Sequence, residues 1–410
     1  MKHCPVFSHA MSDIKKAILT VNGGSSSVKI AVYNVESTLV LSLSAEAKKI
    51  GVSGAVFNFN NNGLSAGNDE INLEGKSYPQ VSEFIVKWIE QQPFFSSIEV
   101  IGHRIVHGMH HAGPAIISNE LLQELKDISP FDPEHLPAEI KLIELFRNAF
   151  PKLQQVACFD TSFHTTMPAV AKLLPVPLKY RSQGVQRYGF HGLSYAYLRR
   201  QLSQVAGKEA ANGKVIMAHL GNGASITALV NGESIDTSMG FTPTGGLPMS
   251  SRTGDLDPGV ILYLLQKEKL TASQLSRLVN HESGLLGISE TTGDMEELIK
   301  RESTDKRAAA AVDFFCYQTK KWIGSFAAAL GGVDTLIFSG GIGEHSAEIR
   351  KRICENLSFL GIEINEERNK QSAEIISPDS GKVTVRVIKT NEEWMIARLI
   401  CDIMNYKIKT

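Results

Sequence analysis

Two stretches of the chain share one pattern of apolar and polar residues. In the first, the apolar run 17–21 leads into the turn 22–27 (Asn-Gly-Gly-Ser-Ser-Ser), and apolar alternation resumes at 29–33. In the second, the apolar run 215–220 leads through Gly-Asn-Gly into the run 224–230. Short apolar runs on either side of a glycine-rich turn predict paired strands, so each stretch is predicted to form a strand, a turn and a second strand.

The first turn carries groups suited to phosphate. Paired glycines let the backbone approach a ligand closely, hydroxyls and N–H groups donate to anionic oxygens, and Lys29 adds a positive charge. A Walker loop would need a second glycine five residues after the first and a following helix, and the sequence has neither. We therefore interpret the turn as a hairpin-type phosphate loop, with a plain Gly-Ser turn as the alternative. Two such hairpins are typical of a duplicated, actin-like α/β nucleotide fold.

Other elements follow from the same patterns. Strands are predicted at 98–106, 156–159 and 335–338, and helices at 81–91, 138–149 and 347–357. The strand ending at Phe159 is followed by Asp160, at the strand edge where open α/β sheets bind ligands. The turn 339–344 offers a helix N-terminus to phosphate or adenosine.

Composition narrows the class of protein. The chain has 410 residues, 43% of them hydrophobic, which is enough for two domains with separate cores. Lys and Arg (42) balance Asp and Glu (43), so no net charge favours nucleic acid or an anionic membrane. No apolar run is long enough to cross a bilayer, and residues 1–10 lack the apolar core of a signal peptide, with Met11 as an alternative start. We expect a cytoplasmic protein.

The positions of the cysteines and histidines indicate whether the protein holds a metal ion or disulfide bonds. The five cysteines are scattered without a C-x-x-C pair, which argues against a disulfide framework or a structural zinc. The histidines gathered within 103–111 allow a metal site, and a role in lining a loop or ligand is the favoured alternative. Arg, His and Asp concentrate in four segments, 102–108, 160–164, 187–192 and 236–258. The last is a long Gly- and Pro-rich stretch, which is typical of a functional loop.

Eight ordered motifs together resemble the acetate kinases. They are Asn22-Gly-Gly-Ser-Ser-Ser, Gly102-His-Arg, Phe159-Asp-Thr-Ser-Phe-His, Tyr188-Gly-Phe-His-Gly, His219-Leu-Gly-Asn-Gly, Met239-Gly-Phe-Thr-Pro, Gly340-Gly-Ile-Gly-Glu and Thr390-Asn-Glu-Glu. The resemblance implies two duplicated actin-like (ribonuclease H-like) lobes with a nucleotide cleft between them. One lobe would comprise 1–162 completed by 388–410, and the other 163–387. It also implies a homodimer that converts acetate and ATP to acetyl phosphate and ADP, reversibly.

The resemblance also implies roles for individual residues. The catalytic residues would be Asp160, His191 and Arg252. The acetate site would be formed by Arg104, Val106, Phe131, Phe190 and Pro243. Nucleotide contacts would come from Lys29, His219, Leu220, Gly221, Asn222, Gly223, Asp294, Gly340, Gly341, Ile342, Gly343 and Glu344. Magnesium, with manganese as an alternative, would be held on the side of Asn22 and Glu392.

Chemistry refines these roles. A carboxylate acceptor is already ionised at pH 7, so the transfer needs no general base, and Asp160 is better suited to organising an arginine or the metal. The cationic groups would offset repulsion between the anionic acceptor and the anionic phosphoryl group.

Four positions depart from the family pattern. Asp132 stands where the family usually has histidine, with His135 nearby as a substitute from a shifted loop. Tyr195 stands where the family has histidine after Gly-Thr-Ser, which predicts altered support around His191. Glu296 replaces an arginine beside the adenosine, which leaves the donor preference open. Phe131 replaces a smaller leucine, and a bulkier wall should favour acetate over propionate.

Three alternatives remain at this point. Two are enzymes, a propionate kinase and a pyrophosphate-using relative. The third is a non-catalytic nucleotide switch of the actin and Hsp70 type, which has no use for paired arginines together with His191.

Overall fold

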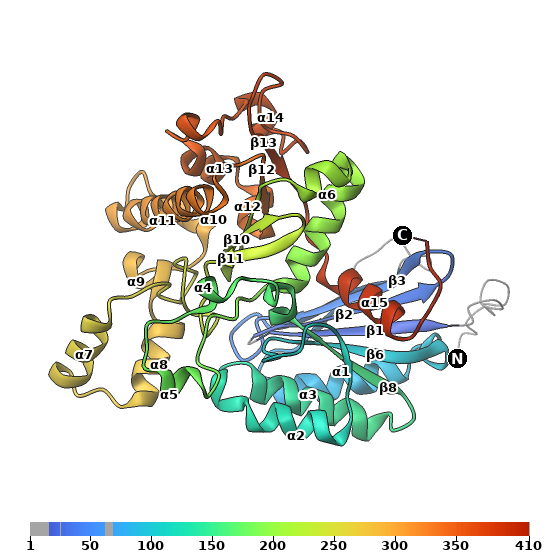
Figure 1. Ribbon diagram of the computed structural model, residues 1–410. Helices are drawn as coiled ribbons and strands as arrows, with labels where there is room; N and C mark the ends of the chain where they lie inside the picture. The colour runs from blue at the N-terminus through green and yellow to red at the C-terminus, as the bar shows by residue number, and fades with distance from the viewer. Residues whose placement is uncertain (1–15, 25, 62–68, 410) are drawn as a thin grey trace. The chain divides into compact units, whose positions relative to one another are not determined.

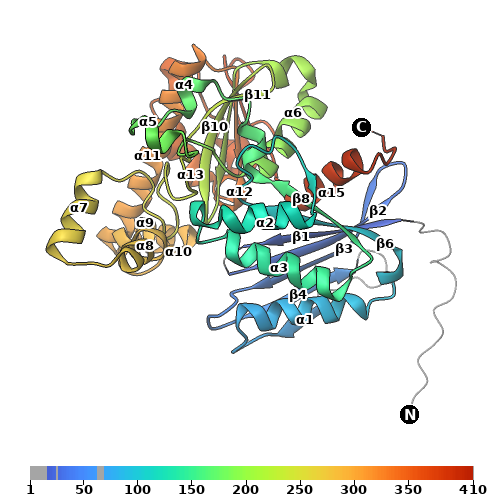
Figure 2. The ribbon, with the colours of Figure 1, turned by 60° about the horizontal axis from the view of Figure 1, so that its bottom comes forward.

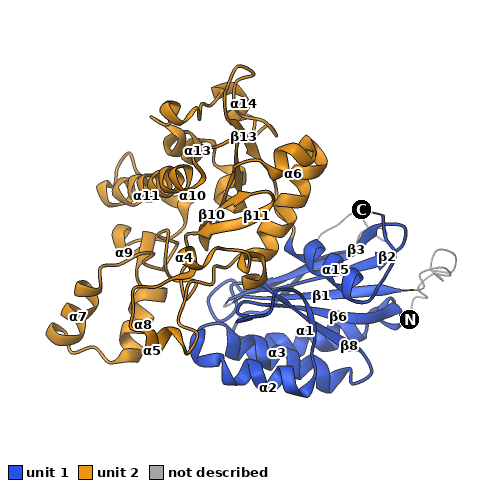
Figure 3. Ribbon diagram, viewed as in Figure 1, with its two compact units in different colours: residues 1–159, 392–410 blue, residues 160–391 orange. Residues whose placement is uncertain are grey.

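The computed structural model of the protein describes residues 16–24, 26–61 and 69–409, and it divides into two compact units (Figures 1 and 3). Unit 1 comprises Met1–Phe159 and Glu392–Thr410, and unit 2 comprises Asp160–Asn391. The chain therefore leaves unit 1 at the end of a strand and returns to it for its last helix. Ser25 of the first turn, and the choice between Met1 and Met11 as the start, lie outside the described residues.

Unit 1 is built on an eight-stranded sheet in the order β5-β4-β3-β2-β1-β6-β8-β7. The predicted first hairpin is confirmed, because β1 and β2 pair antiparallel with Asn22 opposite Lys29. β6 runs parallel to β1, and β8 runs parallel to β6. The strands are β1 (Ala17–Gly23), β2 (Val28–Val35), β3 (Leu39–Lys48), β4 (Val56–Asn61), β5 (Asp69–Asn72), β6 (Ile98–Ile105), β7 (Ala115–Ile116) and β8 (Gln154–Phe159).

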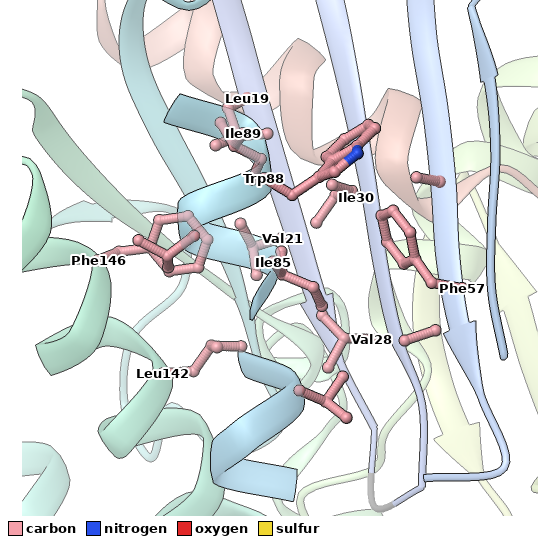
Figure 4. Close-up of a cluster of buried hydrophobic side chains, with 14 of the residues drawn as sticks. Leu19, Val21, Val28, Ile30, Phe57, Ile85, Trp88, Ile89, Leu142 and Phe146 are labelled. Atoms are coloured by element: carbon pink, nitrogen blue, oxygen red, sulfur yellow. The ribbon is translucent and has the colours of Figure 1, made fainter. Parts of the chain in front are cut away.

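Two helices cover one face of this sheet and form its core. They are α1 (Tyr78–Glu90) and α3 (Leu136–Ala149), which lie side by side in Figure 2. α1 starts three residues before its predicted start, because Ser77 and Gln80 form a capping box ahead of Val81. Figure 4 shows the core that results, in which the labelled side chains are Leu19, Val21, Val28, Ile30, Phe57, Ile85, Trp88, Ile89, Leu142 and Phe146.

The opposite face of the sheet is covered by α15 (Glu392–Ile403). Successive strand residues point to opposite faces, and Ile101 of β6 belongs to the core beneath α1 and α3. Its neighbour Gly102 points the other way, where a Cβ atom would overlap Ile400 and lie 2.6 Å from Ile396 of α15. Glycine at this position lets the last helix of the chain lie directly on the first sheet.

Unit 2 repeats the central part of this arrangement. Its five strands are β9 (Val215–Leu220), β10 (Ala224–Val230), β11 (Glu233–Thr237), β12 (Thr335–Ser339) and β13 (Thr384–Val387), in the order β11-β10-β9-β12-β13. β9 and β10 form the predicted second hairpin, and β12 and β13 continue the sheet in parallel. The order matches β3-β2-β1-β6-β8 of unit 1, which confirms the predicted α/β fold built from two duplicated lobes.

Helices α6 (Gly192–Asn212) and α11 (Lys306–Leu330) pack on the second sheet. The shorter helices are α2 (Asn119–Asp127), α4 (Ala169–Lys172), α5 (Leu178–Arg181), α7 (Pro258–Lys267), α8 (Ala272–His281), α9 (Gly284–Ser289), α10 (Met295–Arg301), α12 (Gly340–His345), α13 (Ala347–Cys354) and α14 (Glu366–Lys370). α13 ends three residues before its predicted end, because Glu355 is extended and Asn356 has φ +64°. Within the described part of the chain, no helix has the length and apolar character needed to span a bilayer.

The imidazole of His103 lies in the core of unit 1, with its ring 5.6 Å from that of Phe146. Burial lowers the pKa of His103 to about 4 from an ordinary 6.5. The unfolded chain therefore binds this proton at a higher pH than the folded chain does. Stability from this group is complete above pH 6.5 and is lost as the pH falls toward 4, by about 3 kcal/mol in all.

We expect His103→Gln to weaken this pH dependence, because the amide does not titrate. Urea unfolding at pH 8 and pH 4.5 measures it, and the two midpoints should lie closer together in the variant than in the wild type. The pH 8 midpoint provides the control for the packing change alone. An unchanged gap between the midpoints would contradict the prediction.

Candidate functional site

A polar group gathers where the first hairpin meets the last helix of unit 1. The side-chain amide of Asn22 donates to Glu392 Oε2 at 2.8 Å and to Glu393 Oε1 at 3.1 Å. Lys29 lies opposite Asn22 in the neighbouring strand. The structure thus brings together Asn22 and Lys29 of the first hairpin with Glu392 and Glu393, the pair in the predicted motif Thr390-Asn-Glu-Glu.

Charges in this group support one another. Burial alone would lower the pKa of Lys29, but the carboxylates of Glu393, Glu46 and Glu392 outweigh it and raise that pKa. Burial, with the nearby charge of Glu392, raises the pKa of Glu393, and Lys29 partly offsets this. Because the amide nitrogen of Asn22 already bonds the carboxylates, its oxygen and those carboxylates provide the hard oxygen donors that Mg²⁺ prefers. The residues present therefore fit a divalent cation.

An arginine and an apolar wall lie at the end of β6 in the same unit. Arg104 donates to the carbonyl oxygen of Gly23 at 3.4 Å. Val106 is buried, and its backbone N–H donates to the Glu139 carboxylate at 3.0 Å. The ring of half-buried Phe131 lies 6.0 Å from that of His107, which borders it. A cation beside apolar side chains is the arrangement that a small carboxylate requires.

The substitution at Asp132 has a local partner. Asp132 is buried, and its Oδ1 lies 2.9 Å from Nδ1 of His135. This pair borders the predicted acyl wall, because Asp132 directly follows Phe131 and its charge acts on His107. Burial nevertheless lowers the pKa of His107 to about 4, which keeps that imidazole neutral at pH 7.

The histidines within 103–111 separate into two kinds. His103 and His107 are buried, whereas His110 and His111 lie beside Glu124, with the three ligand-type atoms within 4.8 Å of one another. His111 also stacks on Phe159 at 4.8 Å. The four cysteines of the described chain, Cys158, Cys316, Cys354 and Cys401, are free and buried.

In unit 2, Asp160 and the start of α6 lie against each other. Asp160 is fully buried and begins a 3₁₀ turn directly after β8. A Cβ atom at Gly192 would overlap the Asp160 carbonyl oxygen, so only glycine allows this approach. His191 precedes it with φ +58°, in the left-handed region, and thereby turns its side chain away from the helix.

Two hydroxyl side chains, those of Ser225 and Tyr195, support His191. Its Nδ1 lies 2.8 Å from the hydroxyl of Ser225 on β10, and the same hydroxyl bonds the hydroxyl of Tyr195. Tyr195 thus belongs to the support of His191, and its altering of that support relative to the family's histidine stays a prediction. Sequence reasoning missed Ser225, although its place two residues after the Gly-Asn-Gly turn was a usable signal.

Three predicted groups meet at the second hairpin turn. A Cβ atom on Gly223 would lie 3.2 Å from His191 Nε2 and 3.9 Å from Arg252 Nη1. Arg252 also donates to the carbonyl oxygen of Pro243 at 3.3 Å, within the predicted long loop. That loop contains no helix or strand between β11 and α7. The imidazole and the guanidinium therefore both point at the backbone of the phosphate-type turn.

Some of the predicted nucleotide residues line a cavity of about 530 Å³ in unit 2. Five predicted residues line it, namely Gly221, Asn222, Asp294, Gly341 and Ile342. Sequence reasoning missed Met295, Ile299, His345 and Ser346, which join the lining only through the packing of α10, α12 and α13. Glu296 lines it as well and pairs with Lys300, so the acid that replaces the expected arginine faces a ligand-sized space.

Some predicted nucleotide residues have structural contacts instead of cavity positions. Leu220 is fully buried, and the His219 ring lies 4.6 Å from that of His191. The Glu344 carboxylate accepts from the backbone N–H groups of Gly340 at 3.0 Å and of Thr390 at 3.1 Å. Glu344 thus holds the turn 340–344 in place.

Phe190, a predicted substrate residue, is buried, and its carbonyl oxygen lies 3.0 Å from His164 Nε2.

These features define a class of protein. The chain has two α/β units with the same sheet order, and each unit has a phosphate-type hairpin. An arginine and a histidine face the second hairpin. This combination is typical of a two-lobed enzyme that transfers phosphoryl groups.

Comparison with known proteins agrees and is more specific. A model of the acetokinase family matches residues 17–398. An acetate kinase of Rhodopseudomonas palustris (strain TIE-1) is 41% identical over 394 residues, covering 95% of this chain and 98% of the relative. An acetate kinase of Thermoanaerobacterium thermosaccharolyticum is 39% identical over 392 residues, covering 93% and 97%.

Solved structures give the same family. The structure of Porphyromonas gingivalis acetate kinase has 33% identity and a TM-score of 0.82, covering 95% of this chain and 99% of the other. That of a propionate kinase from Francisella tularensis subsp. tularensis SCHU S4 has 35% identity and a TM-score of 0.86, covering 94% and 98%. The chain belongs to the acetokinase family and is a kinase.

We expect Gly223→Ala to reduce kinase turnover roughly tenfold to hundredfold, because the added methyl group occupies the space at which His191 and Arg252 point. Both groups are side-chain ends that can shift, so the fold should persist. Steady-state turnover and circular dichroism check the two expectations. Gly240→Ala is the matched control, because a Cβ atom there meets nothing within 4 Å. Wild-type turnover in Gly223→Ala would contradict the prediction.

Proposed function

We propose that this kinase transfers the γ-phosphoryl group of ATP to the carboxylate of acetate, giving acetyl phosphate and ADP, and catalyses the reverse reaction. The single observation that carries the mechanism is the convergence of His191 and Arg252 on Gly223. Relatives that cover nearly the whole chain are named acetate kinases, which supports acetate as the acceptor.

ATP is the proposed donor because the cavity in unit 2 suits a nucleoside. Met295, Ile299 and Ile342 give it apolar walls, which pyrophosphate alone would not require. The backbone of the turn 221–223 and the start of α12 provide N–H groups for the phosphates. Glu296 sets the electrostatic character of the base side of this cavity.

The acceptor carboxylate is held by Arg104, with Val106 and Phe131 against its methyl group. Phe190 and Pro243 complete the predicted set of substrate residues in unit 2. The carboxylate is already ionised and attacks the γ-phosphorus directly, so no residue needs to take a proton. Asp160, buried directly after β8, would organise an arginine or the metal through its negative charge.

Positive charge and a hydrogen-bond donor together do the electrostatic work of the transfer. The Arg252 guanidinium and the His191 Nε2 group stabilise the three equatorial oxygens of the migrating phosphoryl group. Asn22 and Glu392 would hold Mg²⁺, for which Mn²⁺ can substitute, and that ion would supply further charge neutralisation at the phosphates. Lys29 balances the carboxylates of this cation site.

Propionate is the second candidate acceptor, because one of the similar structures is named a propionate kinase. Phe131 favours acetate through its bulk. One methylene group is worth about 1–3 kcal/mol in such a pocket, so some activity with propionate is expected.

We expect ATP-dependent acyl hydroxamate formation with hydroxylamine, faster with acetate than with propionate. Arg252→Ala should reduce kcat roughly a hundredfold or more with little change in KM, because the guanidinium acts mainly on the transition state. Arg277→Ala is the control, since Arg277 is exposed and pairs with Glu282. Faster reaction with propionate would favour the second candidate. No product with either acid, despite ATP binding, would overturn the proposed function, and wild-type turnover in Arg252→Ala would overturn its role.

A homodimer is proposed as the working assembly. Helix α7 has no buried residue, and Val260, Leu262 and Tyr263 are exposed on it at 42%, 56% and 58%. An apolar helix exposed along its length is typical of a surface that another protein covers, and we propose that a second copy of this chain covers α7.

We expect Leu262→Glu to shift the protein from dimer to monomer, because a buried carboxylate at a subunit interface is costly. Light scattering coupled to size-exclusion chromatography measures the mass directly. Val205→Glu provides the control, as another exposed apolar side chain of unit 2 on α6. A wild-type monomer, or a dimer unaffected by Leu262→Glu, would contradict this assignment.

A further inference from the structure

Two buried hydroxyl groups support the imidazole of His191 on the side away from Gly223. Ser225 Oγ lies 2.8 Å from His191 Nδ1, and the hydroxyl of Tyr195 bonds the same Oγ. Tyr195 and Ser225 are both 0% exposed, so no solvent competes for these bonds. Tyr195 follows His191 by one helical turn, and its backbone N–H donates to the His191 carbonyl oxygen at 3.0 Å. The two residues are thus fixed to each other through both backbone and side chain.

The direction of these hydrogen bonds follows from the number of protons. Tyrosine and serine each have a single O–H proton, so each can donate only one hydrogen bond. If Tyr195 donates to Ser225, the proton of Ser225 is left for Nδ1 of His191. The phenol of Tyr195 is a stronger acid than the alcohol of Ser225, so it is the donor between these two hydroxyls and donates its hydrogen bond to Ser225 Oγ. Ser225 then donates to Nδ1 of His191.

We propose that Tyr195 is a positioning residue that, through Ser225, holds neutral His191 with its ring proton on Nε2. A nitrogen that accepts a hydrogen bond carries no proton, which leaves the proton of the neutral ring on the other nitrogen. Nε2 is the atom directed at Gly223, where Arg252 Nη1 also points. The N–H bond is therefore aimed in advance at the place where the phosphoryl oxygens would lie. This role rests on the proposed phosphoryl transfer.

The tautomer can be measured independently of activity. In protein labelled with ¹⁵N-histidine, with His191→Gln used to assign the signals, His191 of the wild type should show a protonated Nε2 and an unprotonated Nδ1 at pH 8. Tyr195→Phe should convert this into a mixture, because Ser225 is then free to accept from Nδ1–H. Ser225→Ala should do the same from the other side of the bond. A wild-type ring protonated on Nδ1, or a tautomer unchanged in both variants, would overturn the proposal.

Kinetics give the second readout. Tyr195→Phe should lower kcat roughly threefold to tenfold with KM for both substrates unchanged, the size expected for one hydrogen bond. The double variant with Ser225→Ala should be no slower than Ser225→Ala alone, because both changes break one chain of bonds. Tyr197→Phe is the matched control, since it removes a hydroxyl two residues along the same helix, on another side of it. Equal effects of Tyr195→Phe and Tyr197→Phe, or additive losses in the double variant, would overturn the proposal.

The two readouts separate this inference from the proposed function. Should acetyl phosphate formation fail while the tautomer behaves as expected, the positioning role of Tyr195 stands and the reaction assigned to the site is wrong. A normal reaction combined with the wrong tautomer would instead leave the function intact and reject the role of Tyr195.

Discussion

Close contact between backbones is the constraint on which the site in unit 2 depends. Gly192 lies against the Asp160 carbonyl, Gly340 has φ +76° against Leu220, and Gly284 has φ +61° against the backbone at Met249 and Arg252. A side chain at any of these positions would overlap main-chain atoms, which cannot move as a side-chain end can. The start of α6, the start of α12 and the loop that carries Arg252 are therefore positioned by main chain. The side chains of His191 and Arg252 project from segments that these main-chain contacts position.

Charge is separated along the chain although the net charge is only −1. Unit 1 gathers carboxylates around Asn22 and Lys29, whereas the turn of the second hairpin in unit 2 is faced by an imidazole and a guanidinium. Such a division suits the proposed transfer, because the carboxylates would face a cation and the guanidinium would face the anionic phosphates. Because positive and negative residues nearly balance, the surface also lacks the broad positive electrostatic field that would attract nucleic acid.

The positions that depart from the family pattern have local partners. Asp132 is paired with His135, Glu296 with Lys300, and Tyr195 bonds the serine that supports His191. A buried polar group without any partner would cost free energy, and the two buried groups, Asp132 and Tyr195, each have one, whereas Glu296 and Lys300 are exposed. Of these partners, only Ser225 lies far from its residue in the sequence and is identified by the folded chain alone.

Sequence alone determined the elements whose signals are local. Both hairpins, the glycine-rich turns and the helices α1, α3 and α13 follow from apolar spacing within about ten residues, and the ordered motifs point to the family. The strands β3 to β5 were missed, since their Ser, Asn and Glu residues weaken the alternation. The family resemblance already assigned the C-terminal segment to the first lobe, with Glu392 near Asn22. Only the tertiary structure decided that Ser225 reaches His191 and that α10 and α13 complete the cavity. These contacts join residues far apart in the chain, and they depend on how helices pack on sheets, which no local pattern encodes.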